Sequence, residues 1–224
     1  MPEEIQRNFK LAMSFRQNAV FCLETMLSSK GYINVLNNTR EANVFNLIGN
    51  CLYSKALIEI RKILEPSGKD KKANISSIIK YIEDNKAYFA DKHYKDSLGA
   101  YITDDTNITS NIKDFIKKKN EEEALEAKDY CEKQIDLIIK MWCFFWKQLD
   151  NKYKFIRENR DFIVHSLSKE VTTLPSISKL YKVINIITWF MRKIDFIINN
   201  NAYGYQYEKE QFYNISEVFW SHIK

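Results

Sequence analysis

Turn-forming residues are scarce in this chain, and this scarcity restricts its fold more than any other feature of the sequence. Only 5 Gly and 3 Pro occur among 224 residues. Because sheets of many short strands need tight turns rich in such residues, that architecture is disfavoured. Apolar residues instead recur at helical spacing along extended segments. We therefore expect an all-α protein in which a few long helices are joined by few connections.

The apolar periodicity also predicts where the helices lie. Gly31 follows the first apolar segment at the position of a helix C-cap, and Ser176 precedes the last one as an N-cap. The stretch from Tyr101 to Asn111 is polar and β-branched, so we expect a loop there. The expected helices cover residues 3–29, 40–64, 74–98 with a break near Asn85, 111 or 112 to 146–149 with a kink, and 177–199.

These segments group into one domain and a tail. Residues 1–200 are expected to form a helical bundle with four or five core helices. Residues 201–224 form the tail, which is rich in tyrosine and also carries phenylalanine and tryptophan. Because aromatic side chains bury large apolar areas, we expect the tail to pack against the body or against a partner.

The charge pattern permits a polyanionic partner without requiring one. The net charge is +5, but most lysines stand among acidic residues. The run Lys117–Lys119 is followed at once by Glu121–Glu123. Such alternation is typical of a solvated helix face rather than of a nucleic-acid-binding patch.

Cysteine usage and hydropathy indicate a reduced compartment and no membrane span. We expect buried free thiols and no metal site, because each cysteine lies in an apolar helical stretch and none has metal-ligand spacing. The N-terminal residues lack the pattern of a signal peptide, and charged residues interrupt the apolar run from Leu180 to Ile198. We therefore expect a cytoplasmic protein without a membrane partner. The four cysteines are Cys22, Cys51, Cys131 and Cys143.

One late segment combines an arginine, an acid and a histidine at close spacing. It reads Arg157-Glu-Asn-Arg160-Asp161-Phe-Ile-Val-His165-Ser166 and lies between two expected core helices. This Arg-x4-His pattern, with an acid directly after the arginine, resembles the signature of the HEPN superfamily. That superfamily consists of small helical domains, many of which are metal-independent ribonucleases.

The order of the other segments extends this resemblance to about residues 5–200. The block Leu52–Glu65, a Lys-rich loop and Asn74–Ile82 are similar to the middle of the AbiU-like abortive-infection branch of HEPN proteins. The resemblance implies a HEPN-like bundle and a metal-independent RNA endonuclease that serves as a defence effector or toxin. It also implies a homodimer, an RNA substrate, and an antitoxin or regulatory protein as a partner. In one departure, Leu167 occupies the position of a modifiable tyrosine in some HEPN toxins.

The chemistry of RNA cleavage explains why these residue types would stand together. His165 titrates near neutral pH and can act as acid and base. Arg160 can hold the scissile phosphate through two parallel hydrogen bonds, and Asp161 can orient one of the two residues. On an ideal helix, positions five apart point about 140° away from each other. A symmetric dimer that brings two copies of the segment together is therefore expected to complete the site.

A structural role remains open for the same residues. His165 has apolar neighbours and fits a core histidine, while Arg160 can pair with Asp161 or Glu158 on the surface. Two functions consequently stay open. The first is the RNA endonuclease, and the second is a non-catalytic HEPN-like scaffold that binds nucleotide, RNA or protein.

Other recognisable catalytic patterns are missing from the sequence. It has no Gly-rich phosphate loop, no His-x-x-x-His pair and no Gly-x-Ser-x-Gly elbow. We therefore expect neither a cofactor nor the chemistry of a P-loop hydrolase, zinc hydrolase or serine esterase. His93 and His222 have no catalytic partners nearby in the sequence, and both are expected at the surface.

Overall fold

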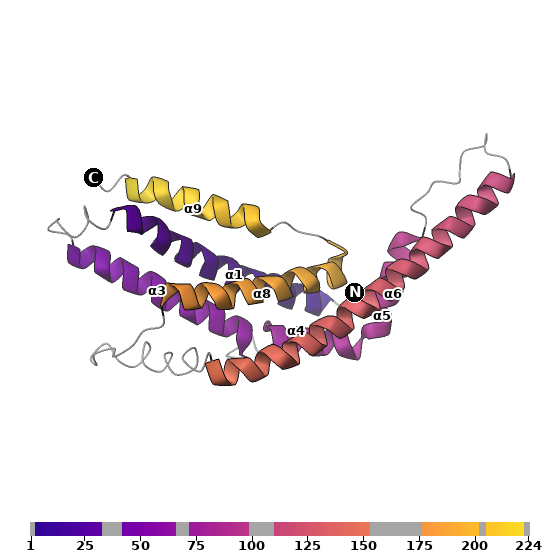
Figure 1. The fold of residues 1–224 in the computed structure, drawn as a ribbon, viewed down its shortest axis with the longest axis horizontal. Helices are drawn as coiled ribbons and strands as arrows, with labels where there is room; N and C mark the ends of the chain where they lie inside the picture. The colour runs from indigo at the N-terminus through magenta and orange to yellow at the C-terminus, as the bar shows by residue number, and fades with distance from the viewer. Residues whose placement is uncertain are drawn as a thin grey trace.

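The chain is all-α throughout the part that the structure describes, as its sequence predicts. This computed structural model describes residues 3–32, 42–65, 72–98, 110–152, 176–201 and 205–221. Every element of regular structure in these ranges is a helix (Figure 1). The helices are α1 (Glu3–Ser28), the 3-10 helix η1 (Ser29–Tyr32), α3 (Ala42–Leu64), α4 (Ile75–Asp84), α5 (Lys86–Ser97), α6 (Ser110–Lys152), α8 (Ile177–Asn199) and α9 (Tyr205–Ser221).

The core lies where α1, α3, α4, α8 and the C-terminal half of α6 meet. The helices α1, α3, α8 and α9 lie alongside one another, and α1 contacts each of the other three (Figure 1). Phe9, Ala12 and Leu23 are buried on the apolar face of α1. Helix α8 is embedded along its apolar face as well, since Leu180 and Ile187 are fully buried. The bundle is therefore held mainly by burial of regularly spaced apolar side chains.

Polar side chains mark two of the predicted helix boundaries. The side-chain amide nitrogen of Asn85 donates to the carbonyl oxygen of Tyr81 at 2.9 Å. Asn85 separates α4 from α5. This confirms the predicted break. At the start of α8, the hydroxyl of Ser176 accepts a hydrogen bond from the backbone N–H of Lys179 at 3.4 Å. The N-cap predicted at Ser176 is thereby confirmed.

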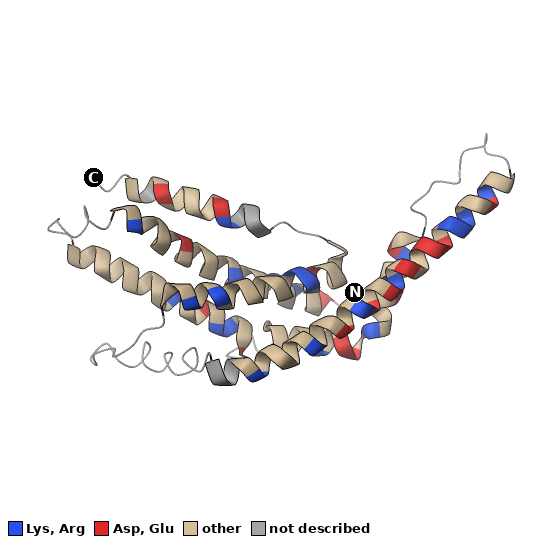
Figure 2. Cartoon of the chain, in the orientation of Figure 1, with Lys and Arg blue, Asp and Glu red and all other residues tan. Residues whose placement is uncertain are grey.

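Helix α6 is the longest element and extends beyond the bundle. Its 43 residues span roughly 65 Å at about 1.5 Å per residue. Its N-terminal half leaves the bundle in the company of α5 and carries lysines and acids in alternation (Figures 1 and 2). Lys117–Lys119 is exposed there, and Lys119 lies 3.7 Å from Glu123. The predicted solvated helix face is therefore confirmed.

The described part of the aromatic tail forms α9, which packs along α1. The indole nitrogen of Trp220 donates to the carbonyl oxygen of Thr25 at 2.8 Å, and the hydroxyls of Thr25 and Ser216 are hydrogen-bonded at 2.8 Å. The rings of Phe21 and Phe212 meet edge to face, with centroids 5.6 Å apart. Buried hydrogen bonds and aromatic packing thus hold α9 against the body.

Two local predictions were wrong. Gly31 lies within η1 with a φ outside the left-handed region, so it is not a left-handed C-cap. The hydroxyls of Ser28 and Ser29 bind the last carbonyl oxygens of α1 instead, at 3.0 and 2.7 Å. Cys51 and Cys143 are exposed, whereas Cys22 and Cys131 are buried as expected. Apolar sequence neighbours did not reveal which side of each helix faces the core.

Hydropathy places the described helices outside the class of membrane spans. Within the six described ranges, no helix combines the length and apolar character needed to cross a bilayer.

Candidate functional site

The three residues predicted to act in catalysis lie outside the described residues. Arg160, Asp161 and His165 fall in the range 153–175, so their positions and their proposed roles remain predictions. The structure does describe the two helices that flank this range. Helix α6 ends at Lys152 and α8 begins at Ile177, and the two helices contact each other.

The first turns of α8 have a fixed orientation because their apolar side is buried. Leu180 and Val183 are fully buried in the core. Lys179 and Lys182, in the same turns, are exposed. The helix therefore presents two ammonium groups to solvent, 13 and 16 residues after Ser166, the last residue of the predicted segment.

Helix α8 is strongly cationic as a whole. It carries Lys179, Lys182, Arg192 and Lys193 but only one acid, Asp195 (Figure 2). Asp195 is buried, and burial raises the pKa of its carboxyl group. The exposed charge of α8 is thus positive, in contrast to the mixed charges on the N-terminal half of α6.

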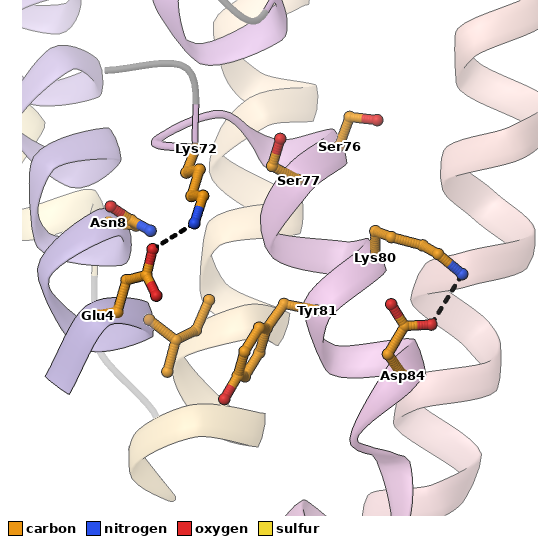
Figure 3. A pocket seen from close by; sticks show the side chains of 9 residues that line it. Glu4, Asn8, Lys72, Ser76, Ser77, Lys80, Tyr81 and Asp84 are labelled. Atoms are coloured by element: carbon orange, nitrogen blue, oxygen red, sulfur yellow. Dashed lines mark hydrogen bonds and ion pairs between the residues drawn. The ribbon is translucent and has the colours of Figure 1, made fainter. Parts of the chain in front are cut away.

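Charge is balanced in the hollow between the N-terminal end of α1 and α4. The ammonium group of Lys72 lies 2.6 Å from the carboxylate of Glu4, and that of Lys80 lies 2.8 Å from Asp84. Figure 3 shows both lysines pointing at their acids. Although this cavity measures about 460 Å³, each of its cations is already paired, so it offers little attraction for an anion.

His93 is buried, which contradicts its expected place at the surface. Its Nε2 atom lies 3.1 Å from the carbonyl oxygen of Ile197 and its ring contacts that of Phe196 at 4.8 Å. Phe89 and His93 are four residues apart on the buried face of α5, so the helix turns both inward. Burial lowers the pKa of His93. His93 therefore has a structural role, because it forms a hydrogen bond with a carbonyl oxygen at the C-terminal end of α8. The ammonium group of Lys92 donates to the neighbouring carbonyl oxygen of Ile198 at 2.9 Å.

The hollow beside His93 is acidic. Glu123, Glu126 and Asp129 line this cavity of about 510 Å³, against Lys133 as its one described lysine. Its charge therefore disfavours a nucleic-acid backbone. In the six described ranges, no group of three or more His, Cys, Asp or Glu side chains is arranged to hold a metal ion.

A third hollow lies between α1, α8 and α9, and its lining is cationic. It contains the fully buried Arg16 together with Arg192 and Lys209. Arg16 is not among the functional residues predicted from the sequence. The sequence does contain a signal for it, because a charged residue at position 16 lies beside the core residues Phe15 and Ala19 on one helix face. Such a placement is rare because a buried charge needs a polar partner.

Comparison with known proteins leaves the family undecided. No family model, no curated protein and no solved structure matches this chain. The likeness to HEPN proteins therefore rests on the residues of the sequence itself, chiefly Arg160, Asp161 and His165.

Proposed function

We propose that this protein is a metal-independent RNA endonuclease of the HEPN type that acts as a homodimer. The observation that carries the proposal is the Arg160-Asp161-Phe-Ile-Val-His165 segment, placed in the sequence between the core helices α6 and α8. The all-α architecture and the exposed Lys179 and Lys182 that follow the segment support it. A role as a defence effector or toxin follows from the resemblance to the abortive-infection branch.

In the proposed reaction, His165 and Arg160 act on one scissile phosphate. A histidine takes the proton of the 2′-hydroxyl, and the 2′-oxygen then forms a bond to phosphorus. The bond from phosphorus to the 5′-oxygen breaks, and that oxygen receives a proton from a second acid, the imidazolium of the other copy's His165. Arg160 balances the negative charge that builds up on the phosphoryl oxygens. Asp161 positions Arg160 or His165. The products are a 2′,3′-cyclic phosphate and a 5′-hydroxyl.

RNA incubated with purified protein in excess chelator tests the assignment of residues. Wild type is expected to cut single-stranded RNA, and His165→Ala to cut about 100- to 10,000-fold more slowly because proton transfer is lost. Arg160→Ala should lose cleavage as well. His222→Ala and Arg7→Ala serve as matched controls, since they remove the same residue types elsewhere in the chain.

Folding must be compared before a loss of cleavage is assigned to chemistry. His165 has apolar sequence neighbours, so its substitution can also loosen the fold. Melting curves of each variant provide this control. Cleavage that survives both Arg160→Ala and His165→Ala would reject these residues as catalytic, and cleavage that stops in chelator would reject the metal-free scheme.

A non-catalytic scaffold that binds nucleotide, RNA or protein is the second candidate. The hollow between α1, α8 and α9 favours it, since the exposed Arg192 lies on its lining and can meet an anionic group. A folded wild-type protein that binds an anionic ligand but never cuts RNA would make this candidate the better one.

A further inference from the structure

The C-terminal half of α6 presents a mixed apolar and basic face to solvent. Leu137, Met141 and Phe144 are 36%, 38% and 61% exposed on it. Lys140 and Lys147 are exposed as well. These five residues occupy positions i, i+3, i+4, i+7 and i+10 of the helix, so they share one side of it. They are called the Phe144 face below.

The opposite side of these turns fixes the orientation of the Phe144 face. Trp142 and Phe145 are buried in the core. Both of their rings meet the ring of Phe190 on α8, with centroids 5.1 and 5.9 Å away. Because these contacts hold α6 against α8, the helix cannot rotate to bury Phe144. The exposure of its ring therefore follows from the packing of the bundle.

The charge of the Phe144 face is positive. Lys140 and Lys147 are the only charged residues in the stretch 137–148 (Figure 2). Within the described ranges, neither lysine takes part in a hydrogen bond or an ion pair. Asp136, the acid before this stretch, is bound instead to a lysine of α5 at 2.7 Å. Asp150 is the first acid after it in the sequence, and one carboxylate does not balance two ammonium groups.

The N-terminal half of α6 contains a matched arrangement with a different charge balance. Phe115 is 67% exposed there, and Lys118 follows it at the same spacing as Lys147 follows Phe144. The ammonium group of Lys118, however, lies 3.9 Å from the carboxylate of Glu122. An exposed ring beside a lysine thus occurs twice on this helix, and at the Phe144 face no described acid pairs with the lysines.

An exposed ring between two ammonium groups matches the chemistry of a single-stranded nucleic acid. Any base can stack on an aromatic side chain, and the phosphates on either side of that base are negatively charged. Lys140 and Lys147 stand on opposite sides of Phe144, each roughly 5 Å from it along the helix axis. A base on the ring therefore brings its flanking phosphates toward the two lysines.

Two other occupants fit the Phe144 face less well. A second copy of the chain would bring its own Lys140 and Lys147 against these lysines, and like charges at a contact are costly. A lipid bilayer binds helices through a broad apolar side. In these turns of α6 the larger apolar side is packed in the core, and three apolar side chains remain outside.

We propose that the Phe144 face binds single-stranded RNA, with one base stacked on Phe144 and the adjoining phosphates at Lys140 and Lys147. The choice of RNA rests on the proposed function, whereas the fit to a single strand rests on the ring and the lysines. Lys147 stands 13 residues before Arg160 in the sequence, on the helix that leads into the predicted cleavage segment. The face holds the strand and takes no part in bond cleavage.

Fluorescence anisotropy of the full chain with a labelled 2′-O-methyl RNA strand of about twelve nucleotides tests the face. Because this strand has no free 2′-hydroxyl, the proposed cleavage reaction cannot consume it, and binding is measured whether or not the protein is a nuclease. Wild type is expected to bind the strand more tightly than a duplex of the same length, since paired bases cannot stack on the ring. Phe144→Ala should weaken binding about 5- to 150-fold, the range for one lost base stack.

Lys140→Gln and Lys147→Gln test the role of charge. Each should weaken binding and lower the slope of log affinity against log salt by about 0.7, as the loss of one phosphate contact does for a single strand. Phe144→Ala should leave that slope unchanged, because it removes no charge. Phe115→Ala and Lys118→Gln are the matched controls, and both should bind as wild type does.

All five substitutions are at exposed positions, so each variant is expected to fold, and circular dichroism checks this. Absence of binding to the strand at ~100 µM wild type would overturn the proposal. Equal affinities for Phe144→Ala and Phe115→Ala, or a duplex bound as tightly as the strand, would overturn it too. Sedimentation with phosphatidylserine vesicles, without binding to the strand, would assign the face to a membrane surface instead. Strand binding that depends on Phe144 in a protein that never cuts RNA would reject the nuclease and support this face.

Discussion

The Nε2 atom of His93 on α5 lies 3.1 Å from the carbonyl oxygen of Ile197 near the end of α8. Because a carbonyl oxygen can only accept, the ring donates through this nitrogen. The contact joins the pair α5 and α6 to the central helix of the bundle. It also makes the stability of the fold sensitive to the protonation of a buried imidazole.

We expect the free energy of unfolding to fall in acid because of His93. Burial lowers its pKa, so between that value and the unfolded value of about 6.5 the unfolded chain binds more protons than the folded chain. The free energy of unfolding contributed by this group is therefore present above about pH 6.5 and falls as the pH drops toward the folded pKa. Urea denaturation at about pH 7 and about pH 5 measures the effect.

His93→Gln is the matched variant for that experiment, since it keeps an N–H donor but does not titrate. Glu24 and Asp195 have pKa values raised by burial and act in the opposite direction, but they are common to both proteins. The wild type should therefore lose more stability than His93→Gln on acidification. Equal losses in the two proteins would show that His93 is not the responsible group.

Trp220 should be the main anchor of the C-terminal helix. It is almost fully buried and donates to the carbonyl oxygen of Thr25 at 2.8 Å. Trp220→Ala is expected to lower the free energy of unfolding by about 3 kcal/mol or more, as large-to-small core substitutions do. Ile215→Ala is the control, because Ile215 is 58% exposed on the same helix. If chemical denaturation gives equal small effects for both, α9 does not contribute to the fold as described.

The two N-caps should differ in strength. Asn74 is fully buried, and its side-chain oxygen accepts from the backbone N–H of Ser77 at 2.9 Å. The corresponding distance at the exposed Ser176 is 3.4 Å. Asn74→Ala is therefore expected to cost about 1–2 kcal/mol and Ser176→Ala well under 1 kcal/mol. Thermal or urea unfolding of both variants measures the difference, and a larger loss for Ser176→Ala would contradict the structure.

A homodimer is expected at micromolar concentration. The reason lies in the sequence spacing of Arg160 and His165. Positions five apart on an ideal helix point about 140° away from each other, so we propose that a second copy completes the site. Sedimentation velocity checks this expectation. A monomer that cleaves RNA at the full rate would contradict the composite site.

Local signals in the sequence were enough to place most helices and their ends. Asn85 and Ser176 were predicted correctly because a break and a cap depend on a few neighbouring residues. The burial of His93 and Arg16 was not predicted, and neither was the exposure of Cys51. Burial depends on which helices pack on which faces, and no short window of sequence contains that information. The predicted site at 160–165 rests on the sequence alone, because the described residues end at 152 and resume at 176.

End-group analysis of RNA cut in excess chelator tests the proposed nuclease chemistry most directly. Wild type is expected to leave a 2′,3′-cyclic phosphate and a 5′-hydroxyl, and a folded His165→Ala protein is expected to leave the RNA uncut over the same period. Products with a 3′-hydroxyl and a 5′-phosphate, or cleavage by His165→Ala at the wild-type rate, would contradict the assignment of His165 as the acid and base of a metal-free ribonuclease.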